Sequence, residues 1–573
     1  MREALEDPEV VYRRRWLVLL VLCVSLVVIV LDNTILNVAL PRLAARPSKG
    51  GLGATGSQLQ WIVDSYTIVF AGLLLTAGSI GDRFGRYRSL AAGLAVFGIG
   101  SALSALATDA NLLIATRAVM GIGGAFIMPS TLSILTNVFT DHKERGKAIG
   151  IWAGVSALGL GIGPVTGGFL LTHFWWGSVF LVNLPFVVAG LVAGYFLIPE
   201  SKDESAARLD PGGAMLSIAG LSTLLWGIIE APDKGWTSPV ILGAFVLGAA
   251  LMAAFFVWES RSSHPMLDLA FFQNPRFSAA SAAITFTFLA LFGLIFLLTQ
   301  YLQLVLDYST IKAGAVLLPQ AAVIMVAAPL SSVWVQRFGT KAVIAAGLGV
   351  VATSMALLTT MGTSSSALHV IVVTMVLGLG MGNVMAPATD SIMGSLPRAK
   401  AGVGSAVNDT TRQVGGAVGV AVFGSLLASR YSSSVRSGLD GVVPPPFLGR
   451  ASDSIGRAYE VAATADLGPR TGRLLSVAKE SFVTGLHTTA IVASTILFVA
   501  MIGVLKFLPA RHLDEEPGGS AEAQDQRSQD GDVDGDGHRL GSSAGGPAAP
   551  VLVGDGTGAT TGRDQAMPAG TGD

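Results

Sequence analysis

The sequence contains little cysteine and little charge, and each scarcity excludes a class of protein. Its one cysteine, Cys23, lies inside an apolar run, which excludes a disulfide framework and a zinc site built on cysteines. Charged residues make up 13% of the 573 residues and hydrophobic residues 51%, whereas soluble domains carry about 25% charged residues. The composition therefore predicts an integral membrane protein.

Net charge and enzyme motifs are also lacking. The formal net charge is −1, so no overall field favours nucleic acid. The sequence has no GxxxxGK[ST] phosphate loop, no HExxH pair and no aspartate-rich metal motif. We therefore expect a protein that is not an enzyme and that uses no cofactor or metal. The apolar run after Arg13–Arg15 is too long for a signal peptide, so we expect no cleaved signal.

What the sequence does have is a series of fourteen apolar segments, each near the ~20 residues that a helix needs to cross a bilayer. The predicted fold class is an all-α membrane protein with fourteen transmembrane helices. The expected spans are 16–40, 58–80, 89–107, 111–138, 148–171, 177–198, 213–230, 239–258, 278–300, 313–335, 342–361, 367–388, 402–429 and 484–508.

Lysine and arginine are unevenly shared between the connections, and this bias predicts orientation. With a cytoplasmic N-terminus, basic residues concentrate in the inside connections, for example at Arg83–Arg88 and Lys143–Lys147. The short outside connections hold only Arg42, Arg46, Lys49, Lys234 and Lys312. An even number of helices then places both termini in the cytoplasm.

A weak internal repeat divides the chain. The stretch 78–87 after the second segment resembles 332–341 after the tenth, with Arg-Phe-Gly at 83–85 and again at 337–339. Transporters are commonly built from repeated halves with the substrate site between them. We predict a cytoplasmic N-terminus (1–15), a six-helix bundle (16–198), two inserted helices (199–258), a second, pseudo-symmetric six-helix bundle (259–508) with an extracellular polar loop (430–483), and a disordered cytoplasmic tail (509–573).

Three charged residues lie inside predicted spans of the first half, where a charge costs roughly 2.5–3.5 kcal/mol and marks a functional site by default. They are Asp32 in the first helix, Asp64 in the second and Arg117 in the fourth. At 1.5 Å per residue, Asp32 lies ~13 Å below the outer surface, and Asp64 and Arg117 lie ~9 Å below it. The three therefore share a depth. The alternatives are that Arg117 extends to the outer surface and that Asp64 is exposed at its helix end.

The loop that follows the second helix contains glycines, an acid and several arginines. Asp82 and the arginines could form a charge network with a facing helix end across the cytoplasmic mouth, and glycine lets the backbone turn tightly. The simpler interpretation is a turn with basic residues that anchor it on the cytoplasmic side.

Helix five carries two glycine ridges at intervals of four residues. One contains Gly146, Gly150 and Gly154, and the other contains Gly159, Gly163 and Gly167, with Pro164 beside Gly163. Such ridges allow close helix packing, and proline can bend a helix. Packing is the default explanation; coupling of the two halves, or a seal against ion leakage, is the sharper one.

The thirteenth helix has a polar cluster about a third of the way in from its cytoplasmic end, formed by Asn408, Asp409, Arg412 and Gln413. Asp409 and Arg412 are three residues apart and could neutralise each other locally. We interpret Asp390, at the same end of the twelfth helix, as interfacial.

Together these stretches resemble the major facilitator superfamily, and in particular its fourteen-helix drug:proton antiporter branch. The segments that carry the resemblance are Leu31–Pro41, Trp61–Asp64, Gly78–Arg88, Arg117 and Gly159–Gly168. The resemblance covers about residues 16–508.

The resemblance implies a role for each motif. Asp32 would exchange a proton, and Arg117 would tune the protonation of Asp32. Asp64 would attract cationic substrate or share the proton task with Asp32. Substrate-binding candidates are Asp64, Trp61, Tyr66, Asn33 and Asn37. The cytoplasmic gate would comprise Gly78, Asp82, Arg83, Gly85 and Arg86, and the antiporter motif would pack through Gly159, Gly163, Pro164, Gly167 and Gly168. The span 313–335 contains no Asp or Glu, which argues against export of divalent cations.

The function that we expect is proton-driven export of small amphipathic compounds across the plasma membrane by a multi-pass monomer. Its partners would be protons, the substrate and the lipid bilayer. A dedicated exporter of one endogenous product is the nearest alternative. Import by symport, and a sensor that binds ligand without transporting it, are less favoured.

Overall fold

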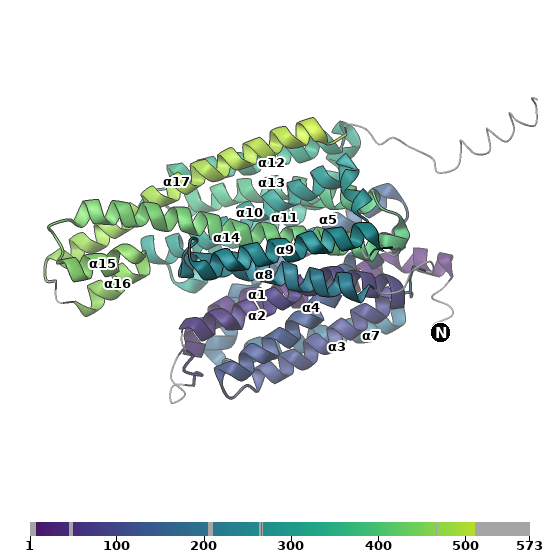
Figure 1. The fold of residues 1–573 in the computed structure, drawn as a ribbon, viewed down its shortest axis with the longest axis horizontal. Coiled ribbons are helices and arrows are strands. Elements are labelled where there is room, and N and C mark those ends of the chain that lie inside the picture. Colours follow the sequence, from purple (N-terminus) through teal and green to yellow (C-terminus); the bar gives the residue numbers. More distant parts are fainter. Residues whose placement is uncertain are drawn as a thin grey trace, which may run out of the picture. The chain divides into compact units, whose positions relative to one another are not determined.

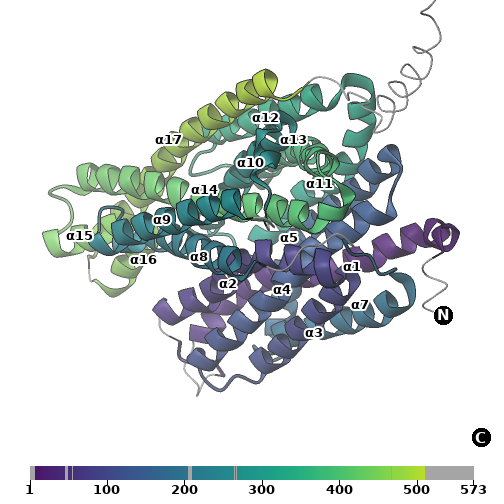
Figure 2. The same ribbon diagram turned by 45° about the vertical axis from the view of Figure 1, so that its right-hand side comes forward.

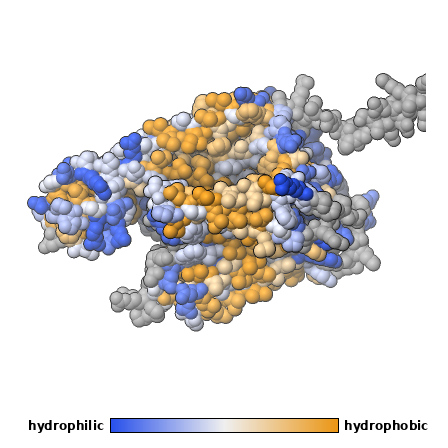
Figure 3. All heavy atoms as spheres, viewed as in Figure 1, coloured by the Kyte–Doolittle hydropathy of each residue, from blue (hydrophilic) through white to orange (hydrophobic). Residues whose placement is uncertain are grey.

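The described residues form helices only, as the composition predicts. The computed structural model describes residues 7–44, 50–54, 56–203, 210–262, 265, 267–465 and 467–509, and the helices among them belong to one compact unit. Thirteen helices in this part of the chain are long and apolar enough to cross a membrane. Hydrophobic side chains form a belt around their middle, with hydrophilic side chains at both ends (Figure 3). The predicted tail beyond residue 509 lies outside the described residues.

The long helices coincide with the predicted spans. They are α1 (Pro8–Ala44), α2 (Gly56–Phe84), α3 (Arg86–Ala105), α4 (Ala110–Val138), α5 (His142–His173), α7 (Asn183–Leu197), α8 (Pro211–Lys234), α9 (Pro239–Arg261), α10 (Pro275–Gln300), α11 (Thr310–Phe338), α12 (Thr340–Leu357), α13 (Ala367–Gly394), α14 (Ala401–Leu439) and α17 (Arg470–Phe507). The short α6 (Ser178–Leu181) continues into α7 as one span. Helix α5 is not among the thirteen, so the count of fourteen and the orientation of the termini remain predictions.

Shorter elements connect these helices. They are α15 (Pro445–Asp453), α16 (Ile455–Thr464), the 3-10 turns η3 (Leu269–Gln273), η5 (Leu358–Thr360) and η6 (Arg398–Lys400), and the π-helical turn η4 (Tyr301–Val305).

The internal repeat is visible in the backbone and in the packing. Gly85 separates α2 from α3 at φ 117°, and Gly339 separates α11 from α12 at φ 81°, a region that favours glycine. In the first half α4 packs on α2 and α3, and in the second half α13 packs on α11 and α12. The pair α1–α5 likewise corresponds to α10–α14. The first half and the second half lie on opposite sides in Figures 1 and 2.

The two halves meet through α5 and α14. Helix α5 packs on α11 and α13 of the second half, and α14 packs on α2 and α4 of the first. Helix α8 of the inserted pair packs on both α2 and α14, where Leu221 and Leu225 of α8 pack with Ala71 of α2 and Val414 of α14. The insertion therefore contacts both halves.

The predicted polar loop 430–483 is helical, which the sequence interpretation did not anticipate. Helix α14 continues to Leu439, α17 begins at Arg470, and α15 and α16 lie between them. Ile455, Ala458 and Val461 are buried on one face of α16. This amphipathic spacing stabilises a helix that is too short and too polar to read as a span.

Candidate functional site

Asp32 and Arg117 form a buried ion pair. The Asp32 side chain on α1 and the Arg117 side chain on α4 are in direct contact, and the residues are 2% and 0% exposed. Asn183, at the start of α7, donates from Nδ2 to Asp32 Oδ1 at 3.1 Å and to Ser101 Oγ at 3.1 Å. Asp32 and Arg117, which we expected at a similar depth in the membrane, are thus in direct contact. Asn183 was missed, because one asparagine at a helix start carries no motif.

Arg117 has further partners that do not depend on Asp32. Its Nε donates to the carbonyl oxygen of Ile62 at 3.1 Å, and its guanidinium lies 4.5 Å from the centre of the Tyr66 ring. Its Nη2 has no hydrogen-bond partner among the described residues. The alternative in which Arg117 extends to the outer surface is therefore wrong: the side chain points into the bundle.

The other substrate-binding candidates differ in how far they are buried. Tyr66 is buried beneath Arg117, Asp64 is half-buried on the same helix, and Trp61 is 36% exposed. The Asn33 side chain is exposed and donates to the carbonyl oxygen of Ile29 at 3.0 Å. The side chain of Asn37 lies outside the described residues. Tyr66 thus belongs to the ion-pair cluster, whereas Trp61 is partly exposed.

The second glycine ridge of α5 packs on α1 next to Asp32. A methyl group on Gly159 would lie 2.7 Å from Val30 Cγ1, and one on Gly163 would lie 2.6 Å from Thr34 Cβ. Thr34 Oγ1 donates to the carbonyl oxygen of Gly159 at 3.2 Å. Gly167 faces Ile35 in the same way, whereas the carbonyl oxygen of Gly168 accepts from Thr172 Oγ1 at 2.7 Å within α5. The side chain of Pro164 lies outside the described residues. This ridge fixes the segment of α1 that carries Asp32.

The first glycine ridge of α5 packs on α11 of the other half. Methyl groups on Gly150 and Gly154 would lie 2.5 Å from Pro329 Cα and 2.9 Å from Met325 Cα. Only glycine permits this backbone approach. Helix α5 therefore packs on α11 of the other half through its first ridge and on α1 through its second. This packing fits the interpretation in which α5 couples the two halves.

The loop after α2 joins the two halves at the end predicted to be cytoplasmic. Asp82 Oδ1 and Oδ2 accept from the backbone nitrogens of Gly402 at 2.9 Å and Val403 at 3.1 Å, at the start of α14. Arg86 Nε donates to Asp82 Oδ1 at 2.9 Å, and its Nη2 donates to the carbonyl oxygen of Arg398 at 2.8 Å. A carboxylate at a helix N-terminus is favoured by the unpaired N–H groups and the helix dipole. This is the charge network with a facing helix end expected from the sequence.

Other residues extend this contact. Gly78 faces the carbonyl oxygen of Gly402, where a methyl group would come within 2.5 Å. Arg145 on α5 forms a 2.9 Å ion pair with Asp390 on α13, so Asp390 bridges the halves. The guanidinium of Arg83 instead lies over the exposed ring of Phe84 at 5.3 Å.

The polar cluster on α14 is buried at the junction of the halves. Arg412 lies over the rings of Trp152 on α5 at 4.9 Å and Phe288 on α10 at 5.2 Å. Its Nη2 donates to Thr389 Oγ1 at 3.2 Å, whereas its Nη1 is 4.0 Å from Asp409 Oδ1. Local pairing with Asp409 is thus weaker than expected, because the aromatic rings and Thr389 hold the guanidinium.

Two further members of the cluster lie beside Thr389. Thr389 Oγ1 donates to Asn408 Oδ1 at 3.2 Å, and Asn408 Nδ2 donates to Asp409 Oδ1 at 3.3 Å. Gln413 is half-buried one turn beyond Asp409. Trp152 and Thr389 were missed, since neither residue type stands out in an apolar run.

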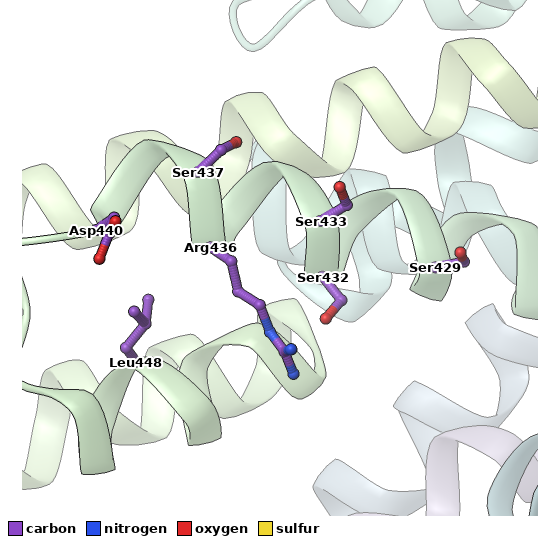
Figure 4. A pocket seen from close by; sticks show the side chains of 7 residues that line it. All are labelled: Ser429, Ser432, Ser433, Arg436, Ser437, Asp440 and Leu448. Carbon is purple, nitrogen blue, oxygen red and sulfur yellow. The ribbon is translucent and has the colours of Figure 1, made fainter.

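The helices within 430–483, which we name the outer helical region, border an open pocket of about 740 Å³ (Figure 4). The pocket holds none of the predicted site residues. It is lined by Ser429, Ser432, Ser433, Arg436, Ser437, Asp440 and Leu448. Arg436 Nε donates to Ser452 Oγ at 3.2 Å, so this arginine ties α14 to α15. We attribute the pocket to the splayed ends of these helices.

Comparison with known proteins agrees with this architecture. The family model described as Major Facilitator Superfamily matches residues 22–420. The chain belongs to the major facilitator superfamily. This facilitator is 38% identical over 495 residues to the multidrug efflux pump LfrA of Mycolicibacterium smegmatis, covering 86% of this chain and 96% of that protein.

Two other relatives of this facilitator match at 32% identity. The tetracenomycin C resistance and export protein of Streptomyces glaucescens matches over 492 residues, 85% of this chain and 90% of the relative. The methyl viologen resistance protein SmvA of Salmonella typhimurium matches over 494 residues, which cover 86% of this chain and 98% of the relative. The human organic anion transporter MFSD10 shares the fold, with a TM-score of 0.58 at 14% identity over 86% of this chain and 99% of that chain. We conclude that this facilitator is a multi-pass transporter of the plasma membrane.

Proposed function

We propose that this protein exports small amphipathic compounds in exchange for protons by alternating access. The observation that carries the proposal is the carboxylate of Asp32, which is 2% exposed on a membrane helix and paired with Arg117. A buried charge is costly in a membrane, and such residues mark ion and proton paths. Relatives named for multidrug efflux and for drug resistance support the substrate class.

The surroundings of Asp32 suit a proton that binds and leaves. Burial favours the neutral carboxylic acid, whereas Arg117 and the Asn183 amide favour the carboxylate. When Asp32 takes up a proton, the Arg117 guanidinium retains its hydrogen bond to the Ile62 carbonyl and its contact with the Tyr66 ring. These contacts continue to stabilise the positive charge of Arg117.

Proton entry would supply the driving force. Each proton that moves inward yields about 2.3 kcal/mol per 100 mV, in addition to the pH gradient. The contacts of Asp82 with α14 and of Arg145 with Asp390 close the end that we predict to be cytoplasmic. In this state Asp32 would exchange its proton and the substrate would leave on the outer side. Asp64, Trp61, Tyr66, Asn33 and Asn37 remain the residues proposed to bind substrate.

Proton-coupled flux in proteoliposomes tests the proposal. We expect uptake of a lipophilic cation into inside-out-oriented vesicles to require an acidic interior, and to fall at least about tenfold in Asp32→Asn because the amide cannot release a proton. Asp64→Asn should lower affinity for cationic compounds more than for neutral ones. Asp453→Asn, at an exposed residue of α15, is the matched control. Undiminished coupled flux in Asp32→Asn would remove Asp32 from the mechanism.

A dedicated exporter of a single product is the second candidate, and the relative named for tetracenomycin C resistance and export favours it. Resistance of expressing cells to compounds of several chemical classes supports the multidrug proposal, whereas resistance to one class supports the dedicated exporter. Accumulation of labelled drug in cells under an inward proton gradient would indicate import. Binding without proton-coupled flux would indicate a sensor.

A further inference from the structure

The segment between α7 and α8 lies across the cytoplasmic loop rather than away from it. Backbone hydrogen bonds join Arg86 N to the Ser201 carbonyl at 2.9 Å and Asp203 N to the Asp82 carbonyl at 2.6 Å. Residues 200–203, which we name the strap, therefore bind the loop that carries both Asp82 and Arg86. The next six residues lie outside the described residues and play no part in this inference.

Glu200 completes the start of α3. Gly85 precedes this helix and has no side chain to cap it, and Glu200 Oε1 accepts from the backbone nitrogen of Tyr87 at 3.0 Å. Glu200 Oε2 lies 3.6 Å from Arg88 Nε. A methyl group on Gly85 would come within 2.6 Å of Glu200 Oε1. A carboxylate that accepts from the first turn satisfies unpaired N–H groups as an N-cap does. The strap thus fixes where α3 begins.

Asp203 connects the strap to the second half. The residue is 4% exposed, and its Oδ2 is 3.5 Å from Lys400 Nζ. Lys400 ends η6, directly before α14, and the neighbouring carbonyls of Arg398 and Ala399 accept from Arg86. The loop after α2, the strap and η6 therefore meet at one place. The Asp203–Lys400 pair is a contact between the halves in addition to that of Asp82 with α14.

The strap also leads into the inserted helices. Helix α8 packs on α2, where a methyl group on Gly72 would lie 3.6 Å from Ser222 Cβ, and on α14 through Val414. Helix α8 of the inserted pair therefore packs on both helices that the gate joins.

We propose that the strap is a working part of the cytoplasmic gate: Glu200 positions the loop after α2, and the Asp203–Lys400 pair holds the halves together until the cytoplasmic side opens. The inference rests on the proposed alternating access. Glu200 and Asp203 are positioning residues that contact neither proton nor substrate.

Accessibility of a gate cysteine tests the strap independently of transport. Cys23→Ser removes the natural cysteine, and Ser405→Cys places a reporter at a buried position of α14. Inside-out vesicles are treated with a membrane-impermeant maleimide. We expect Asp203→Asn and Lys400→Met to be labelled about 1.5 to 5 times faster than the parent, since the closed state loses one ion pair.

Charge exchange and a neighbouring control complete the design. The double variant Asp203→Lys with Lys400→Asp should return labelling toward the parent rate, which simple misfolding would not do. Lys202→Gln, at an exposed strap residue, should leave the rate unchanged. Glu200→Ala tests the strap independently, because it removes the cap of α3 and leaves the Asp203–Lys400 pair in place. This variant should also be labelled faster than the parent.

The result that overturns the inference is an unchanged labelling rate in Asp203→Asn, Lys400→Met and Glu200→Ala. Failure of the proposed function looks different: labelling of the parent would then not respond to substrate or to pH, while the comparison between strap variants at rest would still stand.

Discussion

A methyl group on Gly150 of α5 would lie 2.5 Å from the Cα of Pro329 on α11, so the backbones of the two halves touch at this point. We therefore expect Gly150→Ala to separate the halves and to destabilise the closed state by about 1–3 kcal/mol, the usual cost of overpacking. Purified Gly150→Ala should melt earlier and transport more slowly. Gly243→Ala is the control, because a methyl group on this α9 glycine meets nothing within 4 Å. Equal melting of both variants would contradict the close contact.

Asn183→Ala removes a donor from the charged form of Asp32. A hydrogen bond to a charged group contributes about 1.5–3 kcal/mol, so protonation of Asp32 becomes more favourable. We expect the pH of half-maximal drug–proton exchange to move upward by at least about one unit. Asn383→Ala is the matched control, since this amide donates only to Leu379 of its own helix at 2.8 Å. A pH profile identical to that of the control would exclude Asn183 from proton handling.

Asp82→Ala should open the cytoplasmic end. It removes the acceptor for Gly402 and Val403 and leaves Arg86 buried without its carboxylate. Breaking a buried pair by removing one partner costs about 3–5 kcal/mol. Cysteine labelling from the cytoplasmic side should therefore rise steeply. Asp82→Asn keeps one acceptor oxygen, so its labelling rate should lie between those of the parent and Asp82→Ala. Faster labelling of Asp82→Asn than of Asp82→Ala would refute the capping role.

The outer helical region should loosen in acid. Lys479 Nζ donates to Asp307 Oδ2 at 2.5 Å, and Tyr459 Oη donates to Asp307 Oδ1 at 3.0 Å, which ties α16 and α17 to the turn before α11. The Lys479 ammonium lowers the pKa of the Asp307 carboxyl below its ordinary value. The stabilisation is therefore complete above about pH 4, the unfolded value, and is lost as the pH falls through the lower folded value.

Because Asp307 is largely exposed, we expect its pair to contribute only about 0.2–1 kcal/mol. Asp307→Asn should accelerate proteolysis within 440–470 at pH 7 and have little further effect at pH 3. Asp453→Asn, at an exposed carboxylate of the same region, should leave the digestion pattern unchanged. Greater sensitivity of Asp307→Asn at pH 3 than at pH 7 would contradict the assignment.

The long helices and the shared depth of Asp32 and Arg117 could be predicted from the sequence for one physical reason. A bilayer fixes the length of a spanning helix, so residue number converts directly into depth. Depth placed Asp32, Asp64 and Arg117 at one level, and the resemblance gave Arg117 the task of tuning Asp32, whereas the contact between Asp32 and Arg117 is seen only in the structure. Asp82 was predictable because a carboxylate beside a helix start satisfies free N–H groups.

The rest could not be predicted because the information lies outside single motifs. The strap binds largely through backbone atoms, which the residue type does not reveal. Trp152 reaches Arg412 from a helix distant in the sequence. The helices within 430–483 do carry a signal, the spacing of Ile455, Ala458 and Val461, but Pro444–Pro446 and the nearby glycines obscured it.

The two glycine ridges of α5 also bear on how substrate preference can change during evolution. Gly150 and Gly154 face the backbone of α11, and Gly159 and Gly163 face the side chains of Val30 and Thr34 on α1. None of these four glycines can acquire a larger side chain without displacing its neighbour. New specificities should therefore arise by substitution on helices such as α2, whose Trp61 is partly exposed, while α5 stays constant. Divergence among exporters of this kind would then be concentrated away from the helix that packs on both halves.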